Sequence, residues 1–270
     1  ARTGQVSCFS VAHQKTEYNS YWVDSEGRLW LAPYQQGLEC YSLQDEGKLL
    51  YHYTTDNSLL SHNSVTDIKE FGNELWIATD GGGINILDGS ARIIQHIKRS
   101  PYNEHSISTD FIRVLFEDSF GTKWVGTVRD GLIRIREGFM KHYSNLGDSK
   151  LSANGYRSVS SICEDQSGNI WMGIEHSGLS KYDVKEKRII HFPYTFSGSV
   201  MSIVDFDAHY LLVSFYGEGI YKCHKTTGAL TRFVLANPTV DAQMCRSSIG
   251  IRMHRSPDRT IHFYGCRFMR

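Results

Sequence analysis

The feature that most constrains this chain is a tryptophan that recurs at nearly constant spacing. Four of the five Trp residues follow one another at intervals of 46, 48 and 47 residues, and a Gly followed by Leu or Ile comes seven residues after each of them. These positions are Trp30, Trp76, Trp124 and Trp171, with Gly37, Gly83, Gly131 and Gly178. A fifth copy keeps Gly219 but has Leu212 in the Trp position. Such regular spacing is typical of repeat architectures, in which each repeat is one supersecondary unit.

Each repeat predicts four short strands. In the fourth copy the expected strands are 159–163, 170–173, 179–182 and 188–192. The turn between the first two of them is Asp165–Gly168. Asp at the start of such a turn bonds the turn backbone, and Gly near its end adopts positive φ. In the second copy we expect Asn73 to take this left-handed position. Period-2 patterning in repeats of about 47 residues favours an all-β fold, a β-propeller of four-stranded antiparallel blades.

The repeats predict about five full blades and a partial sixth, in a single domain covering residues 1–270. The expected blades are 20–62, 63–109, 110–155, 156–199 and 200–246, with a partial blade at 247–270. A segment at 5–11 reads as a lone fourth strand that would complete the last blade and close a six-bladed ring. The alternative is a fragment of a seven-bladed ring. Because the chain opens at Ala1 without Met, we expect a processed or truncated product.

Composition argues against several classes of protein. Lys plus Arg and Asp plus Glu number 29 each, and this formal charge of zero argues against a surface that follows nucleic-acid phosphates. No apolar run approaches the length that spans a membrane. The 6 Cys form no Cys-x-x-Cys pair, so neither a zinc knuckle nor a redox motif is expected.

The recurring Trp and Gly residues are interpreted as scaffold. A large apolar ring at the same place in every blade suits packing between neighbouring sheets. Four histidines also recur, on the expected fourth strands: His52, His96, His142 and His191. Because they belong to four different blades, they cannot converge on one metal ion, and we interpret them as surface features of the outer strands. We expect no metal and no cofactor.

The repeat is similar to a known one. The pattern Asp-x-x-Gly-x-x-Trp-x-Gly-Thr-x-x-x-Gly-Leu is clearest at 117–132, with a second good copy at 164–179. It resembles the two-component regulator propeller repeat, and the resemblance extends over roughly residues 5–265. The resemblance implies the periplasmic sensor region of a Bacteroides-type hybrid two-component histidine kinase. In that family the propellers precede a transmembrane helix, a kinase and a response-regulator region, none of which this sequence contains. The implied input is a glycan breakdown product, and the implied output is a change in packing between propellers or protomers.

Candidate binding residues follow from the direction of the strands. Alternating direction predicts that the loops from fourth to first strands and from second to third strands share one face, opposite the Asp turns. Tyr, Arg, Asn and His side chains on such loops suit a polyhydroxyl ligand or a protein partner. The candidate ligand-binding residues are Tyr34, Asn63, Asp80, Arg113, Arg129, Tyr156, Arg157, His176 and Tyr216.

Three functions remain open, and the leading one is a ligand-sensing propeller. The alternatives are a propeller that binds protein without a small molecule, and a propeller lyase or hydrolase. No nucleophile elbow and no His-Glu-x-x-His motif is present, and no carboxylate pair stands apart from the turn Asp residues, so we expect no enzymatic activity in this region. The expected partners are an oligosaccharide and a second copy of the chain, because an incomplete ring exposes strand edges. No nucleic-acid partner is expected.

Overall fold

The computed structural model of the 270-residue chain describes residues 17–103, 106–136, 139–144, 146, 158–192, 194, 199–234, 249–255 and 261–267. Every regular element in these ranges is a β-strand. The same ranges contain no helix with the length and apolar character needed to cross a membrane. The chain divides into two compact units, Ala1–Arg99 and Ser100–Arg270. The closing strand predicted at 5–11 lies outside the described residues.

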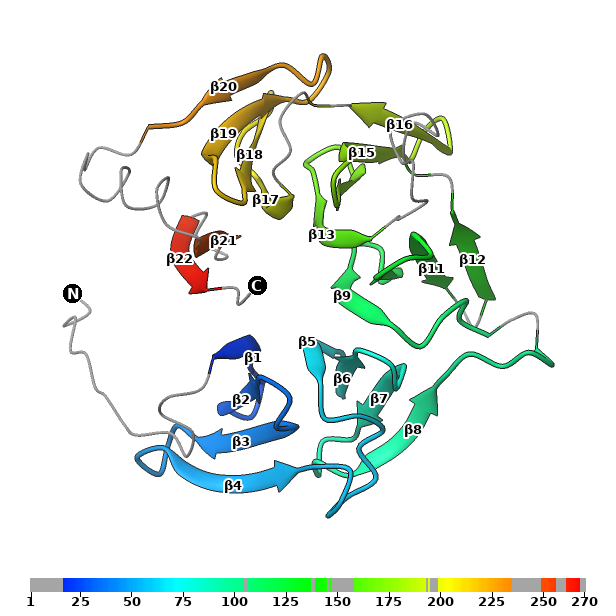
Figure 1. Cartoon of the computed structure of the whole chain (residues 1–270), viewed down its shortest axis with the longest axis vertical. Coiled ribbons are helices and arrows are strands. Elements are labelled where there is room, and N and C mark those ends of the chain that lie inside the picture. Colours follow the sequence, from blue (N-terminus) through cyan, green and yellow to red (C-terminus); the bar gives the residue numbers. More distant parts are fainter. Residues whose placement is uncertain are drawn as a thin grey trace. The chain divides into compact units, whose positions relative to one another are not determined.

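The first unit holds two sheets, each a meander of four antiparallel strands (Figure 1). The first sheet consists of β1 (Tyr18–Val23), β2 (Arg28–Pro33), β3 (Leu38–Ser42) and β4 (Lys48–Tyr53). The second consists of β5 (Val65–Phe71), β6 (Glu74–Thr79), β7 (Ile84–Leu87) and β8 (Ile93–Ile97). Their first strands, β1 and β5, lie side by side, so the two sheets fan out from them as propeller blades do.

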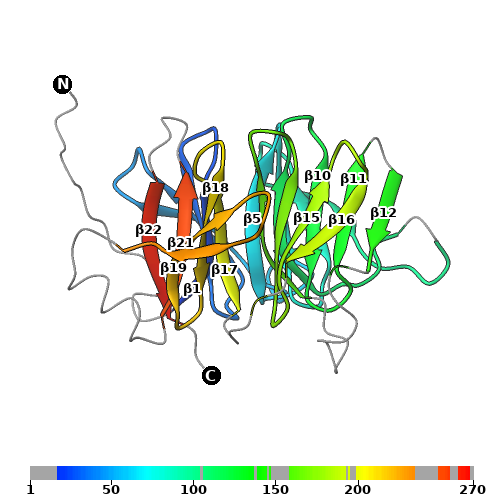
Figure 2. The same ribbon diagram turned by 90° about the horizontal axis from the view of Figure 1, so that it is seen from above.

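The second unit holds three further four-stranded sheets and a hairpin. Its strands are β9 (Ile112–Glu117), β10 (Lys123–Thr127), β11 (Leu132–Arg136), β12 (Phe139–Tyr143), β13 (Val159–Glu164), β14 (Ile170–Ile174), β15 (Gly178–Asp183), β16 (Arg188–Phe192), β17 (Val200–Asp205), β18 (Tyr210–Phe215), β19 (Gly219–His224), β20 (Leu230–Arg232), β21 (Ile249–Arg255) and β22 (Ile261–Arg267). The first strands β9, β13, β17 and β21 adjoin in this order. Figure 2 shows the strands from the side, with the connecting loops at the two ends of each sheet.

This arrangement confirms the predicted all-β propeller of four-stranded blades. Five complete sheets and the β21–β22 hairpin match the expected five blades and partial sixth. The five sheets begin within three residues of the expected blade starts. The single domain over 1–270 and the number of blades in a closed ring stay predictions.

The turn at the start of a blade also holds the Trp of that blade. The indole Nε1–H donates to Oδ2 of the first turn residue at 2.7–2.8 Å, in the pairs Trp30–Asp24, Trp124–Asp118 and Trp171–Asp165. The other oxygen of Asp118 accepts the backbone N–H groups of Phe120 and Thr122. The sequence interpretation gave these Asp residues a role in the turn backbone alone. One carboxylate in fact orders both the turn and the ring that packs against the next sheet.

The second blade departs from this pattern, and the expected role of Asn73 is wrong. The residue with positive φ is Gly72, at 62°, in a shorter turn between Phe71 and Glu74. Glu74 replaces the missing turn Asp, because its Oε2 accepts the Trp76 indole N–H at 3.0 Å. A longer acidic side chain on the strand therefore reaches the same indole group.

In the fifth blade an aromatic cluster stands near the position of the missing Trp. Lys222 pairs with Leu212 across the β18–β19 ladder. Its Nζ lies 4.8 Å from the ring centroid of Phe206 and 5.7 Å from those of Tyr210 and Phe233. A cation over several aromatic rings is attracted by their negative faces. The blade thus keeps aromatic packing without the Trp.

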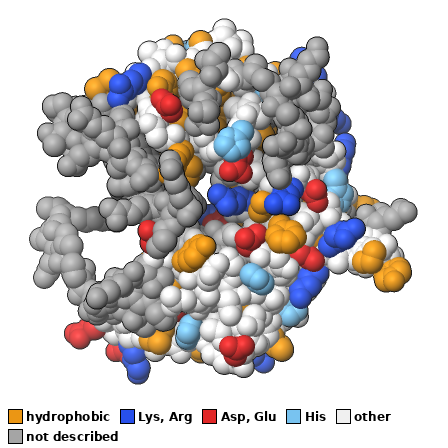
Figure 3. Space-filling view, viewed as in Figure 1, with side chains coloured by type: hydrophobic (Ala, Val, Ile, Leu, Met, Phe, Trp, Pro, Cys, Tyr) orange, Lys and Arg blue, Asp and Glu red, His pale blue; other side chains and the backbone are white. Residues whose placement is uncertain are grey.

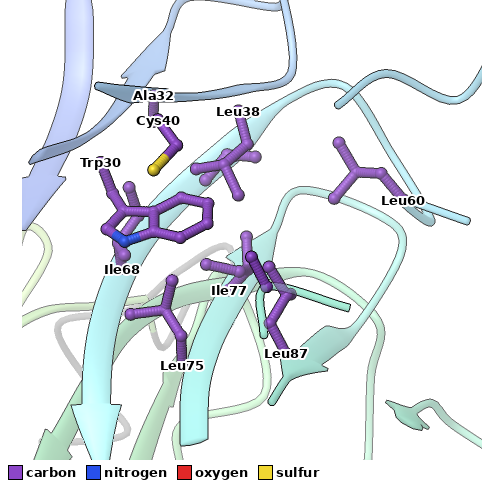
Figure 4. Packing of buried hydrophobic residues seen from close by; sticks show 11 residues of the cluster. Trp30, Ala32, Leu38, Cys40, Leu60, Ile68, Leu75, Ile77 and Leu87 are labelled. Carbon is purple, nitrogen blue, oxygen red and sulfur yellow. The ribbon is translucent and has the colours of Figure 1, made fainter. Parts of the chain in front are cut away.

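The Trp rings lie between neighbouring sheets. Figure 4 shows Trp30 and Leu38 of the first sheet packed with Ile68, Leu75 and Ile77 of the second. Trp171 lies in an equivalent cluster with residues of the β17–β20 sheet. A buried Trp removes roughly 150–250 Å² from water, which stabilises the fold by on the order of 4 kcal/mol.

The buried thiols of Cys40 and Cys223 give a test of this packing. Both side chains are fully buried, and burial raises the pKa of the Cys40 thiol to about 12 and raises that of Cys223 as well. Because the thiolate is the reactive form, we expect neither to react with iodoacetamide in the native protein at about pH 8, and both to react after denaturation. Peptide mass spectrometry measures the labelling. Rapid labelling of Cys40 in the folded chain would contradict the packing of the first two sheets.

Candidate functional site

The loops predicted to share a face do meet at one end of each sheet. In each of the five four-stranded sheets, the residue that follows the second strand donates its backbone N–H to the carbonyl of the residue that precedes the first strand. These bonds are Tyr34–Glu17, Asp80–Ser64, Val128–Phe111, Glu175–Ser158 and Tyr216–Ser199, at 2.8–3.1 Å. We call this the loop end of a sheet, and the end that carries the Asp turns its turn end. The candidate binding residues in the described ranges all belong to loop ends.

In the first unit the structure brings Tyr34, Asn63 and Asp80 to neighbouring loop ends. The Asn63 carbonyl accepts the Gly37 N–H at 2.9 Å, which links the loop of the first sheet to the segment that enters the second. The Asn63 side chain is occupied by Thr55, whose backbone N–H it accepts at 2.8 Å. Asn63 therefore organises its own loop, whereas Tyr34, half exposed, and Asp80, exposed, present their side chains to solvent.

In the second unit Arg113 lies in a β-bulge. Each of the five four-stranded sheets has such a bulge near the loop end of its first strand, at Asn19, Thr66, Arg113, Ser160 and Met201. Bulges turn a side chain out of the regular alternation and are common beside functional sites. No residue type marks these bulges in the sequence, because one extra residue leaves the apolar pattern on either side intact.

The bulge side chains differ in what they contact. Asn19 Nδ2 donates to the Val65 carbonyl at 2.8 Å and Ser160 Oγ to the Val200 carbonyl at 2.6 Å, so each ties its sheet to the next. Arg113 makes no hydrogen bond or ion pair within the described part of the chain, and it is partly exposed. A partly buried guanidinium that is not used within the fold can donate in a planar fork to an anionic or polyhydroxyl group.

The other candidates lie on separate blades of the second unit. Arg129, His176 and Tyr216 are in the loops between second and third strands of the third, fourth and fifth sheets. His176 is exposed and has a φ of 56°, so its backbone is held in the left-handed region. Tyr156 and Arg157 lie outside the described residues.

Two of the loops are ordered by a threonine that the sequence interpretation overlooked. Thr127 Oγ1 donates to the Gly131 carbonyl at 2.9 Å and accepts the Asp130 N–H at 2.9 Å. Thr79 makes the equivalent pair of bonds with Gly83 and Gly82. The Thr that follows Trp-x-Gly or Trp-x-Ala was visible in the repeat and is the sequence signature of this loop.

The recurring histidines lie on fourth strands as predicted, but three of them have contacts that a plain surface role does not explain. His52 Nε2 lies 3.0 Å from the Gln36 carbonyl and His96 Nε2 lies 2.9 Å from the Leu59 carbonyl, which makes these nitrogens the donors. His191 Nδ1 lies 3.0 Å from Ser180 Oγ. They brace the outer strands against neighbouring segments. Within the described residues no His, Cys, Asp and Glu side chains gather as a metal site.

A cleft of about 300 Å³ lies at the other end of the first unit. It is lined at the turn end by Asp24, Ser25, Glu26, Arg28, Glu70, Asn73, Leu75, Asp88 and Gly89. Most of its charged groups are engaged in the fold: Arg28 donates to Asp24 at 2.7 Å, and Glu70 accepts from the Ser25 backbone N–H and hydroxyl. The cleft is therefore mainly a seam between two blades, and sequence reasoning missed it because its walls come from distant turns.

Charge is mixed at the surface. Among the described side chains visible in Figure 3, Lys and Arg are interspersed with Asp and Glu and form no large area of one sign. A protein that follows a phosphate backbone needs a basic stripe or patch. The visible surface agrees with the neutral composition.

Comparison with known proteins supports the repeat and the fold. The family model described as "Two component regulator propeller" matches residues 154–176. No curated protein matches the sequence. Among solved structures, the extracellular domain described as that of hybrid two-component system BT3049 from B. thetaiotaomicron superposes with a TM-score of 0.71 at 17% identity, covering 93% of this chain and 32% of that one.

Two further structures widen the comparison. The extracellular domain of BT4673 from B. thetaiotaomicron, described as a one-component system, gives a TM-score of 0.63 at 17% identity, covering 94% of this chain and 35% of that one. Virginiamycin B lyase from Staphylococcus aureus, solved as an inactive variant with quinupristin, gives 0.62 at 15% identity, covering 94% of this chain and 86% of that one. The chain spans about a third of the length of the two B. thetaiotaomicron domains. The similarity in each case is one of fold, and it identifies the chain as a β-propeller, one segment of which, residues 154–176, matches the two-component regulator propeller model.

Proposed function

We propose that this propeller is an extracytoplasmic, periplasmic sensor module of a hybrid two-component signalling protein, and that it has no enzymatic activity of its own. The observation that carries the proposal is the regulator propeller match at 154–176 together with the fold shared with extracellular domains of two-component systems. The ligand is a glycan-derived oligosaccharide, bound at the loop ends. Binding changes how the propeller packs against the rest of the signalling protein.

The chemistry of the loop ends supports a polyhydroxyl ligand. Tyr34 offers a half-exposed ring on which a sugar can stack, and Asp80 offers an exposed carboxylate that accepts hydroxyl protons. Arg113, Arg129 and Tyr216 offer donors in the second unit. Rigid strands hold these loops, so little ordering is needed on binding. The full set proposed for binding is Tyr34, Asn63, Asp80, Arg113, Arg129, Tyr156, Arg157, His176 and Tyr216.

Thermal unfolding against a panel of oligosaccharides tests the proposal. A ligand that binds only the native state at 100 times its Kd adds about 2.7 kcal/mol, which should raise the Tm by roughly 5–10 °C for a chain of this size. Arg113→Ala should abolish this shift and leave the Tm of the free protein nearly unchanged, because the Arg113 side chain bonds nothing within the described fold.

The matched control is Glu26→Ala, an exposed carboxylate at the turn end of the first sheet. It should retain the full ligand-induced shift. If no sugar moves the Tm and a protein partner is recovered with the purified chain, the second function is favoured, a propeller that binds protein alone. If Glu26→Ala loses the shift and Arg113→Ala keeps it, the ligand binds at the turn end.

A lyase is a further candidate, because the virginiamycin B lyase structure matches this chain over 86% of its own length. Incubation with quinupristin followed by chromatography separates the two functions. We expect the antibiotic to remain unchanged. A new product peak that disappears with His176→Ala would replace the sensor proposal with an enzymatic one.

A further inference from the structure

The outer strands of the five sheets are β4, β8, β12, β16 and β20, each the last strand of its sheet. An edge strand offers backbone N–H and C=O groups to any second strand that can lie beside it. Proteins prevent such pairing with bulges, short strands or charges that would meet across the new ladder. The five edges can therefore be compared by which of these protections each has.

Four of the edges are protected. The β3–β4 and β7–β8 ladders each contain a register shift, so β4 and β8 are bulged. β20 has only three residues. β12 pairs regularly with β11, but its central residue is the exposed Lys141. Two copies of β12 paired about their centres would place two ammonium groups directly opposite each other.

β16 has none of these protections. Its five residues, Arg188–Phe192, pair with β15 in unbroken register. Its central residue is Ile190, a partly exposed β-branched side chain. In an antiparallel pair of two β16 strands, Ile190 faces the partner's Ile190, Ile189 faces the partner's His191, and Arg188 faces the partner's Phe192. No like charges are opposed, and β-branched residues favour a strand.

We propose that β16 is a self-association surface, on which a second copy of this chain adds its own β16 in antiparallel orientation. The two four-stranded sheets then form one eight-stranded sheet across a two-fold axis at Ile190. The geometry is isologous, so the same residues serve both protomers and the assembly closes as a dimer. Such a ladder adds about four backbone hydrogen bonds between the chains, by the alternation of antiparallel pairing. The proposal does not depend on ligand sensing.

The test is the mass of the chain in solution, measured by sedimentation equilibrium. The unsubstituted chain should reach the dimer mass as concentration rises through the micromolar range. Ile190→Lys opposes two charges on the axis and should weaken dimerisation at least about tenfold, the effect of about 1.4 kcal/mol. Ile94→Lys is the matched control, because Ile94 is an exposed β-branched residue on the bulged edge β8. It should leave the dimer unchanged.

Charge complementation fixes the register and guards against a folding defect. Ile190→Lys and Ile190→Glu chains should each be monomeric, and an equimolar mixture should form a heterodimer, since only these two side chains meet on the axis. Far-UV circular dichroism checks that both variants fold. A monomeric unsubstituted chain at high micromolar concentration would overturn the proposal and leave β16 free for another extended peptide. A dimer that survives Ile190→Lys, or a mixture that stays monomeric, would also overturn it.

Discussion

Replacing Gly131 by Ala should lower the free energy of unfolding by about 3 kcal/mol or more. Gly131 has a φ of 80°, a conformation that costs a residue with a Cβ about 1–3 kcal/mol. A Cβ built at this position would also lie closer than 3.0 Å to the backbone oxygen of Tyr143. That oxygen belongs to the last residue of β12, which pairs with Leu132, so neither backbone can move away without breaking the ladder. The two penalties add because they have different origins.

The control lies in the same blade. Gly121 has a φ of 74°, and a Cβ there would have no atom outside its chain neighbours within 4 Å. Gly121→Ala should therefore cost only the backbone term, about 1 kcal/mol. Urea unfolding followed by tryptophan fluorescence measures both variants. If both variants lost the same free energy of unfolding, the close approach of the Tyr143 backbone to Gly131 would be contradicted.

The recurrence of Gly131 and its equivalents explains why the fold could be predicted from the sequence. A position that requires positive φ and no Cβ in every blade appears in the sequence as a Gly at constant spacing. A position whose ring must fill the gap between sheets appears in the same way as a recurring Trp. Gly37, Gly83, Gly131, Gly178 and Gly219 all have positive φ in the structure. In the fourth blade the apolar alternation predicted four strands, each within one residue of its observed bounds.

The site could be predicted less completely, for physical reasons. Strand direction alone decides which loops share an end, so the loop-end positions of Tyr34, Asp80 and Arg113 followed from the repeat. What a side chain does there depends on partners that no repeat reveals. Asn63 is used by Thr55 within its own loop, and the bulge that displaces Arg113 is a backbone event without a residue signature. Whether these residues bind a ligand stays a prediction.

The hydrogen bond between the turn and the indole group was missed for a different reason. In the sequence, Asp118 is fully explained by the N–H groups of its own turn, and nothing demands a further partner. We expect Asp118→Asn to lower the free energy of unfolding by about 2 kcal/mol. The amide oxygen can still accept from Phe120 and Thr122, but the NH₂ group then faces the Trp124 indole N–H, which lies 2.8 Å from Oδ2 in the structure. Two donors then meet in a partly buried position, and turning the amide over would instead set its NH₂ group against the turn N–H groups.

A double-mutant cycle separates this bond from the turn itself. In a Trp124→Phe background the indole donor is absent, so Asp118→Asn should cost less than about 0.5 kcal/mol, giving a coupling of about 1.5 kcal/mol. Asp207→Asn is the matched control in the fifth blade, where Leu212 replaces the Trp and Asp207 accepts only turn N–H groups from His209 and Tyr210 among its described side-chain hydrogen bonds. It should cost little, since the amide oxygen keeps both bonds. If Asp118→Asn costs the same with and without the indole, the carboxylate serves the turn alone and the Trp is held by packing, as the sequence interpretation assumed.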